Sequence, residues 1–130
     1  MYKILIIEDQ VELAQGLKDL IKESGNNLFK VDIAYTLKEG LDILNGHDCI
    51  SLDLVLPDST QGVETYKKVR NATKNRIVIF SGHEAEMKCV SEILDEKDRI
   101  VPKPRSQDYV NLLQQVAEES IAGAMLAAAG

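Results

Sequence analysis

Hydrophobic residues follow two spacings that alternate along the chain. Short continuous runs such as Tyr2–Ile7 are typical of strands, whereas Leu13, Leu17, Leu20 and Ile21 mark one face of a helix. Further strands are predicted at Phe29–Ala34, Cys49–Leu52, Ile77–Phe80 and Arg99–Val101. Further helices are predicted over Leu37 to Leu44 (ending near Asn45-Gly46), Val63–Arg70, Ala85–Leu94 and Tyr109 to Ala117.

This alternation predicts an α/β fold in which a five-stranded parallel sheet is covered by helices on both faces. A chain of 130 residues fits one domain, which we place at residues 1–120. The Ala/Gly-rich tail at residues 121–130 is interpreted as a helix extension, the start of a linker or a cloning remnant.

Composition and charge argue against nucleic-acid binding and against a membrane-spanning protein. The net charge of −6 and the absence of a Lys/Arg stripe argue against direct nucleic-acid binding. The apolar runs are too short to span a membrane and no signal peptide precedes the first strand, so we expect a cytoplasmic protein. Cys49 and Cys89 are both expected to be buried, reduced thiols.

Polar residues gather where the predicted strands end, which is where ligands bind in sheets of this type. They are Glu8, Asp9, Asp53, Ser81-Gly82 and Lys103-Pro104. Asp53 is notable because the stretch "SLDLVLPD" surrounds it with apolar residues, and an unpaired buried carboxylate is costly.

Each of these residues also has an ordinary structural interpretation. Asp9 and Glu12 have the spacing of a helix capping box, Ser81 could be a turn hydroxyl, and Lys103 a solvated surface lysine. Taken together, however, the carboxylates suit a hard divalent cation and the lysine suits phosphate oxygens. A carboxylate can also act as a nucleophile toward phosphorus.

In this order, the acidic pair Glu8-Asp9, the "LDLVLPD" segment with Asp53 and Pro57, Ser81-Gly82 and Lys103-Pro104 make the chain similar to a known family. Residues 2–120 resemble the receiver domain of two-component response regulators. The resemblance implies a doubly wound, flavodoxin-like sheet of strand order 2-1-3-4-5.

The resemblance also implies a role for each site residue. Asp53 would be the phosphoacceptor, and Glu8, Asp9, Asp53 and the backbone carbonyl of Val55 would bind Mg²⁺, with Mn²⁺ as an alternative. Ser81, Gly82 and Lys103 would bind the phosphoryl group, and the bond before Pro104 is a candidate cis peptide. His83 is hypothesised to modulate the rate of dephosphorylation.

Three positions depart from the family pattern. Gly62 follows Pro57 by five residues instead of four, so the acceptor loop carries an apparent one-residue insertion. Ile100 occupies the position of the aromatic switch residue, which excludes a ring rotation there. Arg105 replaces the Phe that follows "KP" in several DNA-binding subfamilies.

The leading hypothesis is therefore a signalling switch in which a histidine kinase or phosphotransfer protein phosphorylates Asp53, changing affinity for an unidentified output protein. Any catalysis would be limited to its own Mg²⁺-dependent phosphorylation and dephosphorylation, with no separate small-molecule substrate. The alternative is a receiver-like interaction module that works without phosphorylation. An aspartyl-phosphate hydrolase ranks last because Val55 stands where such enzymes need a second acid.

Overall fold

A computed structural model describes residues 2–24, 28–103 and 105–129, with side chains described as far as residue 119. Strands and helices alternate along the chain as the hydrophobic pattern predicts. The strands are β1 (Tyr2–Ile7), β2 (Phe29–Ala34), β3 (Cys49–Leu52), β4 (Arg76–Ser81) and β5 (Arg99–Pro102). The helices are α1 (Val11–Ser24), α2 (Leu37–Asp42), α3 (Gly62–Ala72), α4 (Glu84–Ser91) and α5 (Ser106–Ala129).

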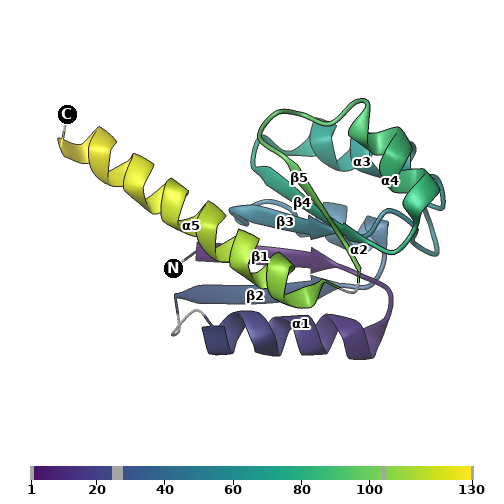
Figure 1. The fold of residues 1–130 in the computed structure, drawn as a ribbon, viewed down its shortest axis with the longest axis horizontal. Helices are drawn as coiled ribbons and strands as arrows, with labels where there is room; N and C mark the ends of the chain where they lie inside the picture. Colours follow the sequence, from purple (N-terminus) through teal and green to yellow (C-terminus); the bar gives the residue numbers. More distant parts are fainter. Residues whose placement is uncertain (1, 25–27, 104, 130) are drawn as a thin grey trace.

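The strands form one parallel sheet in the order β2-β1-β3-β4-β5, which confirms the predicted fold (Figure 1). Because each parallel connection must cross over through a helix, both faces become covered. β1 shows the consequence: Ile4 and Ile6 pack with α1 and α5, whereas Leu5 and Ile7 pack with α2, α3 and α4. Burial on both faces explains why the strands are continuous apolar runs.

Helix boundaries are the main differences from the sequence-based expectation. The second helix was predicted to end near Asn45-Gly46, but α2 ends at Asp42 because Ile43 leaves the helical conformation. The chain then turns toward β3 through Gly46, whose φ of 89° is readily adopted by glycine. α4 ends at Ser91 instead of Leu94, and α5 begins at Ser106.

The cysteine prediction is half wrong. Cys49 is buried in β3, and burial raises the pKa of its thiol to about 12. Cys89 is exposed on α4, because that helix turns only one side toward the core through the buried Val90. Sequence spacing alone did not fix which side of this short helix faces inward.

The last helix is longer than the sheet it packs against. Figure 1 shows the C-terminal part of α5 running past the amino-terminal ends of the strands, and the helical backbone includes residues 121–129. Tyr109, Leu113 and Val116 lie on the buried side of the N-terminal half of this helix. The domain boundary at residue 120 stays a prediction.

Candidate functional site

Parallel strand order brings the predicted site residues to one edge of the sheet. Glu8 and Asp9 follow β1, Asp53 follows the neighbouring β3, Ser81 ends β4 and Lys103 follows β5. The Asp53 amide N–H donates to the Ile7 carbonyl at 3.0 Å, which continues the pairing of β1 and β3 by one step. The acidic pair and Asp53 are therefore held side by side by backbone hydrogen bonds.

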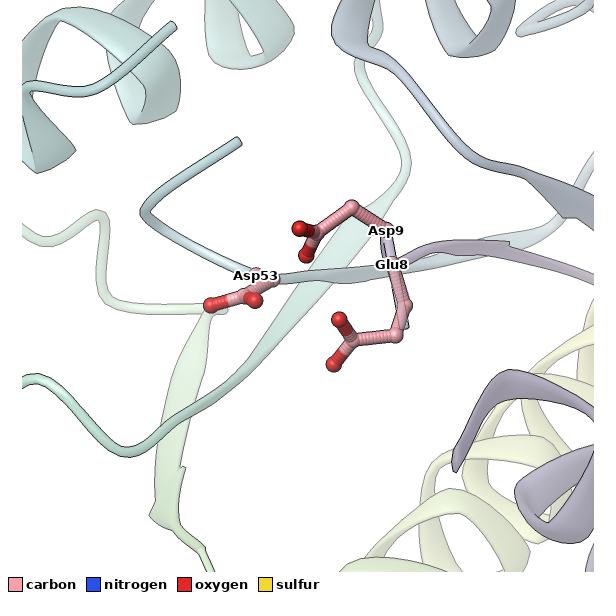
Figure 2. A group of neighbouring side chains, drawn as sticks. All are labelled: Glu8, Asp9 and Asp53. Atoms are coloured by element: carbon pink, nitrogen blue, oxygen red, sulfur yellow. The ribbon is translucent and has the colours of Figure 1, made fainter. Parts of the chain in front are cut away.

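Three carboxylates converge at this edge (Figure 2). One oxygen from each of Glu8, Asp9 and Asp53 lies within 4.8 Å of the others. Glu8 is 3% exposed and Asp53 is 5% exposed. The buried Asp53 Oδ1 has no hydrogen-bond partner among the described residues. A buried carboxylate oxygen without a partner fits a bound hard cation or a covalent phosphoryl group, so these residues suit Mg²⁺.

Lys103 supplies the positive charge of the cluster. Its Nζ donates to Glu8 Oε1 at 2.5 Å and lies 3.4 Å from Asp53 Oδ2, so Glu8 is the closer partner. Burial alone lowers the pKa of Lys103, but the hydrogen bond to Glu8 and the charge of Asp53 offset it and raise the pKa overall. Lys103 is therefore a charged, paired residue of the site and not a solvated surface lysine.

Glu8 has an unusual protonation equilibrium. Burial raises the pKa of this carboxyl group to about 7, and the nearby charge of Asp53 acts in the same direction. Hydrogen bonds from Lys103 and from the Gln10 amide N–H oppose the shift. The folded environment of Glu8 therefore favours the protonated, neutral form of this carboxyl group more than water does.

Ser81 is buried at the end of β4, and its Oγ accepts a hydrogen bond from the His83 amide N–H at 3.2 Å. Its carbonyl also accepts from the Lys103 amide N–H at 2.9 Å, which ties β4 to the residue after β5. His83 is exposed and occupies the N-cap position of α4. Ser81 therefore makes the kind of turn hydrogen bond that its ordinary structural interpretation expects. It also lies at the same edge of the sheet as the acidic cluster, because β4 neighbours β3.

The capping-box interpretation of Asp9 is wrong. α1 begins at Val11, and the carbonyl of Gln10 accepts the first helical hydrogen bond, from Ala14. Gln10 thus holds the N-cap position, one residue after Asp9. This leaves the Asp9 carboxylate available to the cluster in Figure 2.

The remaining assignments stay predictions. Nothing in the structure tests the ligand role of the Val55 carbonyl, the role of Gly82 or the effect of His83 on dephosphorylation. Pro104 lies outside the described residues. Ile100 is half-buried and packs against the core beneath α2, α3 and α4.

The acceptor loop before α3 contains a tight turn. Leu56 and Ser59 exchange two backbone hydrogen bonds of 2.9 and 3.1 Å, so Pro57 and Asp58 form its tip. Ser59 Oγ contacts Thr65 Oγ1 at 2.6 Å, and Asp58 accepts hydrogen bonds from the amide N–H groups of Leu37 and Lys38. The acceptor loop is thereby attached to both α2 and α3.

Sequence reasoning missed a buried contact beneath the site. The Tyr109 hydroxyl of α5 donates to Ser51 Oγ at 2.5 Å, two residues before Asp53. The ring centroids of Tyr109 and Phe80 are 4.5 Å apart. Lys103 Nζ lies 5.9 Å from the centroid of the Phe80 ring. The polar Ser51 inside an apolar strand was the available signal, but only the fold identifies its partner.

Comparison with known proteins decides the family. A family model described as the response regulator receiver domain matches residues 4–116. The chain belongs to this family. It is 30% identical to the transcriptional regulatory protein CpxR of Escherichia coli K12 over 105 residues, covering 80% of this chain and 44% of that protein. It is 31% identical to the cell cycle transcriptional regulator CtrA of Caulobacter vibrioides over 109 residues, covering 82% and 46%.

Solved receiver structures have the same fold. A two-component response regulator from Clostridium difficile superposes with a TM-score of 0.77 at 25% identity, covering 91% of this chain and 97% of that one. The response regulator TrrA from Thermotoga maritima, solved in complex with Mg²⁺-BeF, gives 0.74 at 19% identity, covering 89% and 99%. That second likeness concerns the fold alone.

These matches place this receiver domain in two-component signalling. The chain spans less than half the length of the curated relatives named above, which are transcriptional regulators. Within the described residues, the structure contains no helix with the length and apolarity needed to cross a membrane.

Proposed function

We propose that this receiver domain is a phosphorylation switch whose acceptor is Asp53. The observation that carries the proposal is the position of Asp53: it is buried, one of its oxygens has no partner among the described residues, and two further acids and one lysine surround it. A carboxylate kept in this state is costly unless another group completes its environment.

The chemistry assigned to the chain is phosphoryl transfer. A carboxylate oxygen of Asp53 attacks phosphorus, an acyl phosphate bond forms, and the bond from phosphorus to the donor breaks with its electron pair leaving on the donor. Lys103 Nζ lies 3.4 Å from Asp53 Oδ2, so its ammonium group would pair with the oxygens of a phosphoryl group on Asp53. Ser81 would bind another of these oxygens by releasing the His83 amide.

Glu8, Asp9 and Asp53 would hold Mg²⁺, with the Val55 carbonyl as a further proposed ligand. The cation would neutralise negative charge on the transferring group. We propose a histidine kinase or a histidine phosphotransfer protein as donor and a separate protein or domain as output. The added charge on Asp53 would shift the population of surface conformations that this output partner recognises.

The test is the intact mass of the protein after incubation with acetyl phosphate and Mg²⁺. We expect a gain of one phosphoryl group in the native sequence. Asp53→Asn and a sample treated with EDTA should show no gain. Glu64→Gln is the matched control, because it removes an exposed carboxylate from the first turn of the neighbouring α3 and should leave phosphorylation intact.

A gain that persists in Asp53→Asn would place the acceptor elsewhere and refute this assignment. If no gain occurs, addition of Mg²⁺ and beryllofluoride shows whether the pocket can bind a phosphoryl mimic. Failure of both experiments would favour the alternative of an interaction module that works without phosphorylation.

A further inference from the structure

A hydrogen bond between two helices joins the acceptor loop to α4. The Gly62 amide N–H, at the first residue of α3, donates to Glu86 Oε2 of α4 at 2.7 Å. The N-cap residue of α3 is Gln61, whose side chain makes no capping hydrogen bond. A carboxylate from another helix therefore takes the place of the missing local cap, where negative charge is favoured.

Gly62 is also the point of closest approach between these elements. A Cβ atom at this position would lie 2.8 Å from Glu86 Oε2 and 2.9 Å from Glu86 Cβ. A real Cβ would have to displace the base of the Glu86 side chain, and with it the backbone of α4. Glycine therefore permits the contact that the carboxylate then fixes.

α4 has few other attachments to the core. Val90 is its one fully buried residue, with Met87 partly buried beside it. At its start, the amide N–H of the N-cap residue His83 donates to Ser81 Oγ. The N-terminal half of α4 is thus held by Ser81 on one side and by Gly62 on the other.

We propose that Glu86 is a positioning residue that couples phosphorylation of Asp53 to the position of α4. When Ser81 turns toward the phosphoryl group, His83 loses its acceptor, and α4 can move only if the Glu86–Gly62 hydrogen bond breaks. The contact that carries this proposal is the 2.7 Å hydrogen bond between the Gly62 amide N–H and Glu86 Oε2. The phosphorylation half of the inference rests on the proposed function above.

Glu86→Ala tests the coupling, with Glu84→Ala as the matched control because Glu84 is an exposed acid in the same first turn of α4. Loss of the bond should favour the activated position of α4. We therefore expect phosphorylation by acetyl phosphate to be about fivefold faster in Glu86→Ala, the factor for the net loss of one hydrogen bond. Glu84→Ala should match the native sequence, and Glu86→Gln, which keeps an acceptor oxygen, should restore the native rate.

Hydrogen exchange of α4 amides gives a second readout that needs no phosphodonor. These amides should exchange faster in Glu86→Ala than in Glu84→Ala. If Glu86→Ala does not fold, Gly62→Ala disturbs the same contact from the side of α3 and should speed both exchange and phosphorylation.

Two results would overturn the proposal: an unchanged or slower phosphorylation rate in Glu86→Ala, or equal α4 exchange in the two alanine variants. If the native sequence neither takes up a phosphoryl group nor binds beryllofluoride, the proposed function fails instead. The exchange comparison then still decides whether Glu86 holds α4 against α3.

Discussion

At the scale of single residues, Glu8 shows how the fold creates a chemical state that exposed glutamate lacks. The side chain is almost fully buried, and the groups that donate to it are the Lys103 ammonium and the Gln10 amide. Burial outweighs these donors and raises the pKa of Glu8 to about 7 from an ordinary value of 4.5. Between pH 4.5 and about 7, the Glu8 carboxyl group thus keeps a proton in the folded protein that it releases in the unfolded chain.

This shift predicts the direction of pH dependence for the metal-free protein. Between pH 4.5 and about 7 the folded state binds more protons at Glu8 than the unfolded state does, so stability falls as the pH rises. Glu8→Gln should flatten this part of the profile, removing a change of about 2 kcal/mol in the free energy of unfolding. Urea unfolding in EDTA from about pH 5 to pH 7.5 measures it.

The control for this experiment is Glu12→Gln, an exposed acid in the first turn of α1. It should leave the slope of stability against pH unchanged. A Glu8→Gln protein whose profile matches the native one would contradict the raised pKa of Glu8. Addition of Mg²⁺ should also reduce the slope, because a bound cation favours the ionised carboxylate.

At the scale of elements, short helices here depend on carboxylates from distant parts of the chain. α2 has six residues, too few to be stable alone. Thr36 caps it locally by accepting from the Glu39 amide, and Asp58 of the acceptor loop accepts from the Leu37 and Lys38 amides at 2.9 Å each. α3 uses Glu86 in the same manner.

Asp58→Ala should therefore destabilise the domain through α2. Two backbone N–H groups lose their acceptor, and the expected cost is about 1 kcal/mol in the free energy of unfolding. The measurement is urea unfolding at pH 7. Asp42→Ala is the control: this exposed acid of α2 forms a surface ion pair with Lys38 and should change stability by less than about 0.5 kcal/mol. Equal effects of the two substitutions would argue against the cap.

At the scale of the whole molecule, a buried network joins elements on one side of the sheet. Asp98, before β5, is 1% exposed and accepts from Tyr66 and Arg70 of α3 and from the Ile77 amide of β4. Arg70 in turn donates to the carbonyls of Thr73 and Asn75. One carboxylate therefore fixes α3, β4 and the approach to β5 relative to one another.

Asp98→Ala should be the most destabilising of the substitutions considered. It leaves the mostly buried Arg70 guanidinium and the Ile77 N–H without their acceptor, and breaking a buried pair from one side costs about 3–5 kcal/mol. Tyr66→Phe removes the hydroxyl that donates to Asp98 and accepts from the Asp95 amide N–H, and the loss of these two hydrogen bonds should cost about 2 kcal/mol. Urea unfolding of both proteins measures these costs, and a loss below about 1 kcal/mol for Asp98→Ala would contradict a structural role for the network.

Sequence alone determined the order and type of the elements, the parallel sheet and most of the site. Those features depend on local spacing and on the rule that the carboxyl ends of parallel strands share one edge of a sheet. The sequence therefore sufficed to group five residues at that edge: Glu8, Asp9, Asp53, Ser81 and Lys103. The end of α2 and the exposure of Cys89 could not be predicted, because tertiary packing decides where a short helix stops and which side it buries.

Only the tertiary structure decided which residues are partners. Lys103 pairs more closely with Glu8 than with Asp53, Glu86 caps α3, and Asp98 joins Tyr66 and Arg70. These pairs are between 24 and 95 residues apart in sequence. No periodicity encodes such contacts, because they depend on the crossover paths that bring separate strand ends and helix starts together and on the burial that makes an unpaired charge costly.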